Sequence, residues 1–446
     1  MKTYEFSYGK GTQTVDLPEE HIIYDLHGKE VAVEKDIAAA ALKALRNPID
    51  SKPLAEIVRP GEKVAIVVSD ETRLCYTDQF LPVIVKELND QGIPDADIDI
   101  VIATGTHRAQ TPEEDILVLG EEMVKRFRVH QHNCRDTENL VYKGTTSRGN
   151  KVYINKIVAN ADKIIATGAV TLHPMAGFGG GRKAIVPGVA GLETINHNHV
   201  LALAEKPGDG CNPNVTTAKL EGNPFHEDLM ECVEFVDPDF LLDVVLTSEG
   251  GLYEVVAGNW KTAFYQGCKD LLEISGIPVK ELADVVIASG GGYPKDINLY
   301  QGTKSHMNVD MAVKPGGIAI IMLECPDIKE PAVFTDWLIK SDLQKTEQEV
   351  RDNFYMAAFV AYKSRCIIEA HTVYLVTRKE NFDFVRQTGQ IPVETVAEAW
   401  QLAQEQLAAE GRTDYTITLM GHAPVTLPVL TEETSDEKSS KILGNS

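Results

Sequence analysis

Residues 63–70, KVAIVVSD, decide the fold that the sequence predicts. They form a short apolar run that ends in Ser69 and Asp70, and a segment with a helical apolar period follows at 78–88. Similar apolar runs at 97–103 and 162–168 also end in polar residues or glycine. Strand, polar turn, helix and strand in this order predict a mostly parallel α/β sheet. Ligands bind such sheets at the carboxyl ends of their strands.

The same pattern returns in the second half of the chain. Apolar runs at 283–289, 316–323 and 372–377 and a helical pattern at 400–410 predict a second α/β domain. We therefore expect two α/β domains with mostly parallel sheets and an active site in the interdomain cleft. The predicted parts are an N-terminal domain at 1–275, a C-terminal domain at 276–430 and a polar, mobile tail at 431–446. Helical residues at 262–274 are expected to link the two domains.

Composition excludes several classes of protein. The 446 residues include 43 Lys and Arg and 66 Asp and Glu, which gives a net charge of −23 and excludes a nucleic-acid binder that works by bulk charge. A hydrophobic fraction of 43% excludes global disorder. No apolar run approaches the roughly 20 residues of a membrane span, and the N-terminus lacks an apolar signal core. The seven scattered cysteines indicate a reducing compartment, so we expect a cytoplasmic protein without a membrane partner.

A glycine-rich segment at 171–188, TLHPMAGFGGGRKAIVPG, carries the most informative chemistry. Four glycines within five residues allow backbone N–H groups to approach an anion closely. Lys183 adds a point charge or a nucleophilic amine. The spacing matches neither a Walker A motif nor a dinucleotide fingerprint. The alternative is a flexible loop with a solvated lysine.

Histidines supply candidate ligands and bases. Of the two histidines in NHNH (196–199), one can ligate a metal through a neutral imidazole, and we favour His199. Two histidines at this spacing face the same way on a strand but not on a helix. His107 lies in ATGTHR (103–108), which has the chemistry of a general base in a polar turn.

The segment SDETR (69–73) follows the neighbouring predicted strand. Arg73 can hold a carboxylate or phosphate with two hydrogen bonds, and the hydroxyls of Ser69 and Thr72 can bind phosphate oxygens. Asp70 can instead cap the following helix.

The second domain contributes GGYPKDINLYQGTK at 291–304. Tyr300 and Lys304 are four residues apart, and Gln301 and Lys304 three apart, so they share a helix face. Lys304 can complete a carboxylate clamp, although an ordinary amphipathic helix start gives the same pattern.

Taken in order, these motifs resemble those of the lactate racemases that use a nickel-pincer nucleotide. The resemblance covers most of the chain. The shared motifs are SDETR (69–73), ATGTHR (103–108), HPMAGFGGGRKAIVPG (173–188), GLETINHNH (191–199), GNPFH (222–226) and GGYPKDINLYQGTK (291–304).

The resemblance implies a racemase or epimerase that acts on a 2-hydroxy acid through a 2-keto acid, by proton-coupled hydride transfer. It implies nickel held in a pyridinium-3-thioamide-5-thiocarboxylic acid mononucleotide, bound covalently at Lys183 and supplied by cofactor-synthesis proteins. His199 then corresponds to the nickel ligand, and His107 and His173 to a pair of acid/base histidines.

The other predicted site residues follow from the motifs and the resemblance together. The predicted cofactor-binding residues, besides Lys183, are Ser69, Thr72, Gly177, Gly179 and Gly180. The predicted substrate-binding residues are Asp70, Arg73, Tyr300, Gln301 and Lys304.

The chemistry explains these residue types. Removal of a hydride from a 2-hydroxy acid leaves a planar keto acid without stereochemistry. One base must take the hydroxyl proton and one acid must return it, and histidines with pKa values near 6.5 suit both tasks.

One feature departs from the family pattern. Lactate racemases place a tryptophan near the reacting centre, and none of Trp260, Trp337 and Trp400 stands at that place, so Phe354 or a neighbour is expected there. Two alternatives stay open: a zinc-dependent hydrolase with the ligands His107, His173 and His199, which would also need an open water site, and a non-catalytic nucleotide-binding module.

Overall fold

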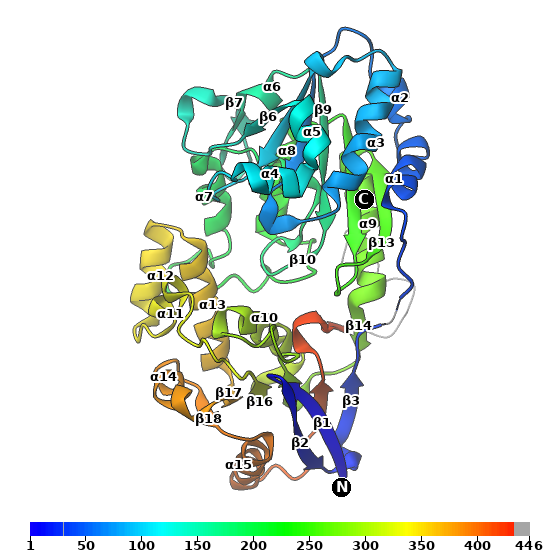
Figure 1. Cartoon of the computed structure of the whole chain (residues 1–446). Coiled ribbons are helices and arrows are strands. Elements are labelled where there is room, and N and C mark those ends of the chain that lie inside the picture. Colours follow the sequence, from blue (N-terminus) through cyan, green and yellow to red (C-terminus); the bar gives the residue numbers. More distant parts are fainter. Residues whose placement is uncertain (30, 432–446) are drawn as a thin grey trace. The chain divides into compact units, whose positions relative to one another are not determined.

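The computed structural model describes residues 1–29 and 31–431, and the tail predicted at 431–446 lies outside them except for Thr431. The described chain forms two compact units (Figure 1). The central unit contains residues 31–202 and 212–274. The terminal unit contains residues 1–29, 203–211 and 275–431. Each unit is built on a six-stranded sheet, which confirms the predicted class of two α/β domains with mostly parallel sheets.

The sheet of the central unit has the strand order β13-β12-β9-β4-β5-β6, and only the pair β12 and β13 is antiparallel. The three runs that the sequence indicates as strands are β4, β5 and β9. The strands are β4 (Val64–Ser69), β5 (Ile98–Ala103), β6 (Arg128–Gln131), β9 (Lys163–Val170), β12 (Phe240–Leu246) and β13 (Leu252–Gly258), with two hairpins, β7 (Leu140–Thr145) with β8 (Lys151–Asn155) and β10 (Leu172–His173) with β11 (Gly177–Phe178).

Helices cover this sheet because their apolar residues recur on one side. In α3, Phe80, Ile84 and Leu88 are buried in a common core with Ile66 of β4. Burial of one such side chain contributes about 1.5–3 kcal/mol to stability. The helices are α1 (Ile37–Arg46), α2 (Leu54–Ile57), α3 (Thr77–Asp90), α4 (Pro112–Leu119), α5 (Glu121–Arg126), α6 (Lys156–Ala159), α7 (Leu192–Val200), α8 (Pro224–Glu234) and α9 (Trp260–Ser275), with 3-10 turns η2 (Glu71–Arg73), η3 (Asp95–Asp97), η4 (Thr137–Asn139) and η5 (Gly181–Ala184).

The sheet of the terminal unit is parallel throughout, in the order β18-β17-β16-β15-β19-β3. Its strands are β3 (Ile22–Leu26), β15 (Ala283–Ser289), β16 (Val313–Met322), β17 (Thr372–Val376), β18 (Ile391–Val393) and β19 (Ile417–Met420), with the pairs β1 (Lys2–Tyr8) and β2 (Gly11–Leu17), and β14 (Gly276–Val279) and β20 (Leu427–Leu430). Its helices are α10 (Leu299–Asp310), α11 (Ala332–Leu338), α12 (Leu343–Asp352), α13 (Met356–Ala370), α14 (Phe382–Gln387) and α15 (Val396–Ala409), with 3-10 turns η1 (Glu19–His21), η6 (Lys379–Asn381) and η7 (Ala423–Val425).

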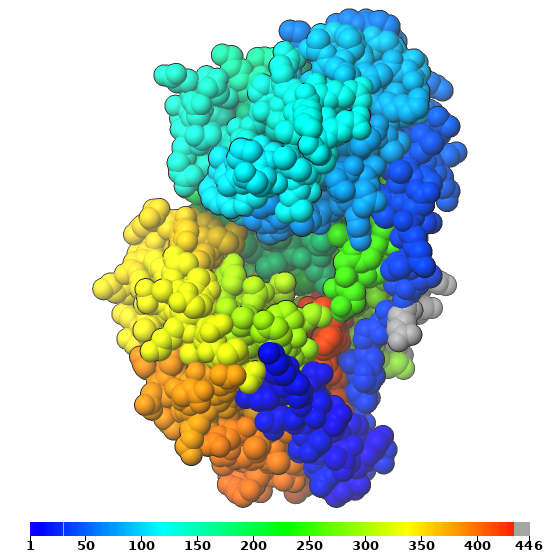
Figure 2. Space-filling view, viewed as in Figure 1, coloured from blue at the N-terminus to red at the C-terminus, as the bar shows by residue number. Residues whose placement is uncertain are grey.

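The start of the chain folds with its end. Strand β3 occupies an edge of the terminal sheet beside β19, and Leu17 of the hairpin shares a core with Val285 and Trp400. In Figure 2 the dark blue first residues lie beside the orange C-terminal segment, in agreement with the packing of β2 on α15. The chain is thus divided differently from the predicted ranges 1–275 and 276–430, because an edge strand and an apolar hairpin face need partners that only the later residues supply.

No helix within residues 1–29 and 31–431 is both long and apolar enough to cross a bilayer.

The hairpin packing can be tested by Leu17→Ala. Leu17 is fully buried, so its truncation should lower the free energy of unfolding of the terminal unit by about 2–5 kcal/mol. Urea denaturation measures this loss. Thr14→Ala, at an exposed position of the same strand, is the control and should change stability by less than about 0.5 kcal/mol. Equal stabilities of the two variants would contradict the packing.

Candidate active site

Two polar turns meet at the carboxyl edge of the central sheet. Strands β4 and β5 are parallel neighbours in register, with Ser69 opposite Ala103. Asp70 follows the first strand and His107 lies in the turn after the second. The sheet therefore brings together the two motifs that the sequence predicts as site residues.

Asp70 and His107 form a hydrogen-bonded pair. His107 Nδ1 lies 2.5 Å from Asp70 Oδ2, and Asp70 Oδ1 accepts from the backbone N–H of Thr72 (3.1 Å) and from its hydroxyl (2.6 Å). Burial favours a raised pKa for the Asp70 carboxyl, but the hydrogen bonds from His107 and Thr72 outweigh it and lower the pKa. A carboxylate only accepts, so His107 Nδ1 carries the hydrogen and Nε2 is left to exchange protons on an imidazole that is 44% exposed.

The Thr72 bond also shows that Asp70 caps the 3-10 turn η2, as the alternative interpretation expected. Capping and support of His107 use different carboxylate oxygens, so the two roles coexist. Arg73 is exposed, and its guanidinium donates to the carbonyl of Thr72 at 2.8 Å.

His173 lies in the hairpin that follows β9, in an environment unlike that of His107. Its Nδ1 accepts from the backbone N–H groups of Met175 (3.2 Å) and Ala176 (3.1 Å), a pattern that a protonated ring cannot make. Burial, followed by the charges of Lys183 and Arg73 and by weaker contributions from Arg182 and His199, lowers the pKa of His173 well below its usual value. His173 is therefore neutral.

Lys183 lies half-buried in the 3-10 turn η5. Burial and the guanidinium groups of Arg182 and Arg73 lower the pKa of Lys183 well below its usual value. Positive charges nearby disfavour the protonated form of the amine. A lower pKa favours the uncharged amine, which is the nucleophilic form of lysine.

His199 is buried on α7. Its Nδ1 donates to the carbonyl of Ile195 at 2.7 Å, and burial lowers its pKa to about 4. The ring is therefore neutral with an unprotonated Nε2, the form of imidazole that ligates metals. His197 on the same helix has Nε2 3.0 Å from the carbonyl of Arg148, so the two rings have different surroundings, as expected on a helix.

The glycines of the loop lie close to the protein's own atoms. A Cβ at Gly177 would lie 2.4 Å from the carbonyl oxygen of Lys219, and both Gly177 and Gly180 have a φ of +73°. The N–H of Gly179 donates to the carbonyl of Thr171 at 2.6 Å. These contacts explain the need for glycine without a ligand, so the predicted cofactor contacts of Gly177, Gly179 and Gly180 stay predictions.

The motif GNPFH (222–226) contributes a residue that binds the backbone of the glycine-rich loop. Asn223 is fully buried and caps α8 with its side-chain oxygen. Its amide donates to the carbonyls of Met175 and Lys219, both at 2.9 Å. Asn223 thereby ties the segment after His173 to the start of α8.

Three predicted substrate-binding residues lie on α10 of the terminal unit. The amide oxygen of Asn298 caps this helix. Gln301 and Lys304 are exposed, while the ring of Tyr300 packs edge-on against Phe334 at 5.3 Å. Their approach to the substrate and the interdomain position of the site stay predictions.

The tryptophans and Phe354 are spread over both units. Trp260 and Trp400 are buried, and Trp337 lies beneath the ammonium group of Lys340 at 3.5 Å. Phe354 is half-buried and 5.5 Å from the ring of Phe359. Its proposed place beside the reacting centre stays a prediction.

Within the described ranges, no three His, Cys, Asp or Glu side chains are grouped so that they could hold a metal ion. His107, His173 and His199 therefore do not form the three-ligand zinc site of the hydrolase alternative.

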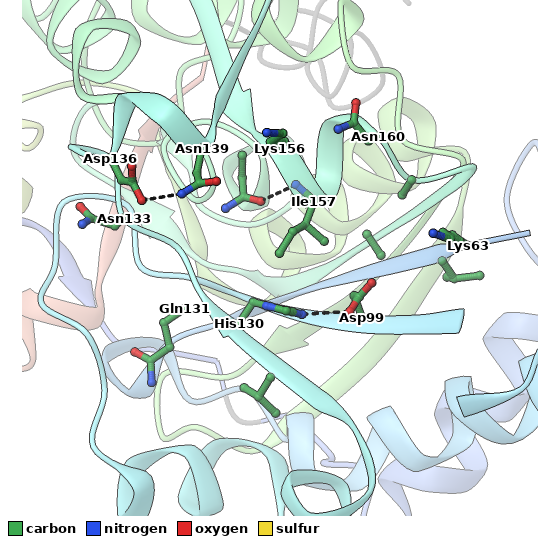
Figure 3. Close-up of a pocket in the computed structure, with 15 residues that line it drawn as sticks. Lys63, Asp99, His130, Gln131, Asn133, Asp136, Asn139, Lys156, Ile157 and Asn160 are labelled. Carbon is green, nitrogen blue, oxygen red and sulfur yellow. Dashed lines mark hydrogen bonds and ion pairs between the residues drawn. The ribbon is translucent and has the colours of Figure 1, made fainter. Parts of the chain in front are cut away.

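A groove of about 690 Å³ lies away from these residues (Figure 3). It is lined by Lys63, which precedes β4, and by Asp99 and His130, whose side chains are joined at 2.9 Å. None of the predicted site residues lines it. Asp99 and Lys63 belong to the amino-terminal ends of their strands, opposite to the edge that carries Asp70.

Two buried charged residues beside the loop were not predicted. Arg182 lies within the motif 171–188, where the pattern assigned it no role of its own, and Asp243 lies on β12. A lone aspartate inside the apolar run 240–246, FLLDVVL, was the available signal for Asp243. A charge in a buried strand requires a partner, so such an interruption indicates a special role.

Comparisons with known proteins find relatives that match most of the chain. A family model of the lactate racemase N-terminal domain matches residues 8–210, and one of the lactate racemase C-terminal domain matches 279–422. A lactate racemase of Thermoanaerobacterium thermosaccharolyticum is 32% identical over 411 residues, covering 91% of this chain and 95% of that protein. A lactate racemase of Lactiplantibacillus plantarum is 29% identical over 391 residues, covering 84% and 88%.

Solved structures agree with these matches. The lactate racemase apoprotein from T. thermosaccharolyticum superimposes with a TM-score of 0.82 at 31% identity, over 96% of this chain and all of that one. A protein from Thermotoga maritima gives a TM-score of 0.56 at 17% identity, over 90% of this chain and 100% of that one, a likeness of fold alone.

Proposed function

The chain belongs to the lactate racemase family and is an isomerase, and from this premise we propose that it is a racemase or epimerase of a 2-hydroxy acid that uses a nickel-pincer nucleotide. The observation that carries the proposal is that His173 and Lys183 lie on one loop, whose backbone Arg182 holds by hydrogen bonds to the carbonyls of Ala176 and Gly180. Lys183 also lowers the pKa values of both His173 and His199, in agreement with a place near both. A candidate tether, ligand and acid/base group therefore share one site.

The residues present fit the proposed cofactor. Lys183 offers an amine with a lowered pKa for a covalent bond, and His199 offers an unprotonated imidazole nitrogen, which nickel accepts as a ligand. The hydroxyl of Ser69 suits a phosphate, and that of Thr72 would have to leave Asp70, to which it donates at 2.6 Å, before it donates to one. When bound, the cofactor supplies an acceptor for the hydride of the substrate carbon.

The two acid/base histidines differ in a way that suits inversion. Nδ1 of His107 donates to the carboxylate of Asp70, whereas Nδ1 of His173 accepts from two backbone N–H groups. In uncharged rings this leaves Nε2 of His107 as a proton acceptor and Nε2 of His173 as a proton donor. Inversion needs this unlike pair, because a proton leaves the substrate hydroxyl on one side and returns to the oxygen from the other.

Further parts of the proposal concern recognition and supply. Arg73 would hold the substrate carboxylate, and Tyr300, Gln301 and Lys304 would complete its binding. Cofactor-synthesis proteins would deliver the pincer nucleotide, and a cytoplasmic location agrees with the seven free cysteines.

The experiment that tests the proposed function is the mass of protein from a nickel-fed native host. Wild-type protein should carry an addition that maps to Lys183, and Lys183→Ala should lack both the addition and racemase activity. Lys156→Ala is the control, because this exposed lysine of the same unit should leave both unchanged. Wild-type activity in Lys183→Ala would contradict the tether.

Nickel retention tests the metal ligand. His199→Ala should retain less nickel than His197→Ala, because only His199 combines burial with an unprotonated Nε2 near Lys183. Metal analysis of the two purified variants measures the difference. The two histidines are two residues apart on α7, so His197→Ala controls for damage to the helix. Equal nickel contents would remove the special role of His199.

The acid/base pair can be tested by rates and isotopes. His107→Ala and His173→Ala should each lose at least about 10²-fold in racemisation rate, the usual size of a general acid/base effect, while keeping the cofactor. Substrate deuterated at the reacting carbon should retain deuterium there in the inverted product. Complete exchange of that label into water would instead mark carbon deprotonation and refute hydride transfer.

A further inference from the structure

The loop that carries His173 and Lys183 is closed by the guanidinium group of Arg182. This side chain is 1% exposed. Its Nη2 donates to the carbonyl of Ala176 at 2.7 Å and its Nη1 to that of Gly180 at 3.4 Å, and the group lies over the ring of Phe264 at 4.1 Å. One cation therefore binds both ends of the segment 176–180.

A second buried charge holds the next residue of the loop. Asp243 is 0% exposed, and its Oδ2 accepts from the backbone N–H of Gly181 at 2.5 Å. A Cβ at Gly180 would lie 2.5 Å from this oxygen. On the neighbouring strand Gly168 stands opposite Asp243, and a Cβ there would lie 3.3 Å from Oδ1. Glycines thus leave room for the carboxyl on two sides.

These anchors act on the two functional side chains through short runs of backbone. The N–H of Ala176 donates to Nδ1 of His173, and the carbonyl of Ala176 is held by Arg182. The N–H of Lys183 donates to the carbonyl of Gly180 at 3.0 Å. A shift of either anchor therefore displaces His173 or Lys183.

Packing alone does not explain this pair. Within the described chain, Asp243 Oδ1 and Arg182 Nε are buried without a hydrogen-bond partner. Such unsatisfied polar atoms are costly, and apolar residues would fill the same space at less cost. Two buried ionisable groups with unsatisfied atoms behind the loop therefore indicate a role in the site.

We propose that Asp243 and Arg182 are positioning residues that hold the backbone of 176–183 so that Lys183 meets the cofactor in reactive orientation. This inference rests on the proposed function of Lys183 as the tether. Neither residue is expected to touch the substrate.

Asp243→Ala tests the inference, with Asp243→Asn as the conservative variant that keeps an oxygen for the N–H of Gly181. In protein from the nickel-fed native host, Asp243→Ala should carry at least about 10-fold less of the Lys183 addition, because small misplacements strongly reduce reactivity. Asp243→Asn should stay within about two-fold of the wild type, since the hydrogen bond remains. A readout without cofactor is hydrogen exchange of the peptide 173–188 in the apoprotein, which should be faster only in Asp243→Ala.

Asp296→Ala is a matched control. Asp296 is also 0% exposed, accepts from a glycine N–H (Gly9, 2.7 Å) and has a buried Oδ1 without a partner in the described chain, but it lies in the terminal unit. The Asp296→Ala variant should lose about as much stability as Asp243→Ala and should keep the Lys183 addition. If Asp243→Ala does not fold, Arg182→Lys replaces it, because an ammonium cannot bind both loop carbonyls in the same way and should also reduce the addition.

The outcomes separate the two proposals. A wild-type level of the addition in Asp243→Ala, or in Arg182→Lys, would overturn the positioning role while leaving the tether intact. An equal loss in Asp296→Ala would also overturn it, because general destabilisation would then be the cause. Wild-type protein without any addition at Lys183 would overturn the proposed function and this inference together.

Discussion

The site depends on two neighbouring basic side chains, Arg182 and Lys183, that share one loop. Burial lowers the pKa of Arg182 only to about 10, so this group keeps its proton, and its charge together with burial lowers the pKa of Lys183 well below the usual value. The same positive surroundings keep His173 uncharged. Unprotonated nitrogens are what a covalent tether and a metal ligand both require.

The parallel sheet places an acidic side chain, Asp70, at the same edge as these basic groups. Asp70 and His107 follow neighbouring strands, where a buried carboxylate supports the imidazole. The loop with His173 continues from β9, the strand on the other side of β4. One edge of one sheet thus carries two histidines with unlike hydrogen bonds: Nδ1 of His107 faces a carboxylate, and Nδ1 of His173 accepts from two backbone N–H groups.

The glycines illustrate how one pattern can have two explanations. Four glycines within five residues predicted a loop that binds an anion through its backbone N–H groups. In the structure the backbone at these glycines instead lies close to the carbonyl of Lys219 and to the carboxyl of Asp243. An N–H of the loop that is already bonded within the protein, such as that of Gly179, contributes little to a ligand. The loop is therefore explained first as a rigid support for Lys183.

The sequence by itself determined the strands, the α/β class and the motifs that end β4 and β5, because apolar periodicity and polar turn residues are local signals. It favoured His199 over His197 as a ligand through the spacing from Lys183 and the resemblance of the motifs, while leaving open whether the segment is helix or strand. Only the tertiary structure joined residues 1–29 to the later domain and placed Asp243 behind the loop. It alone decided which nitrogens lose their protons, because a pKa depends on burial and on charges brought near by folding, and neither is written in the local sequence.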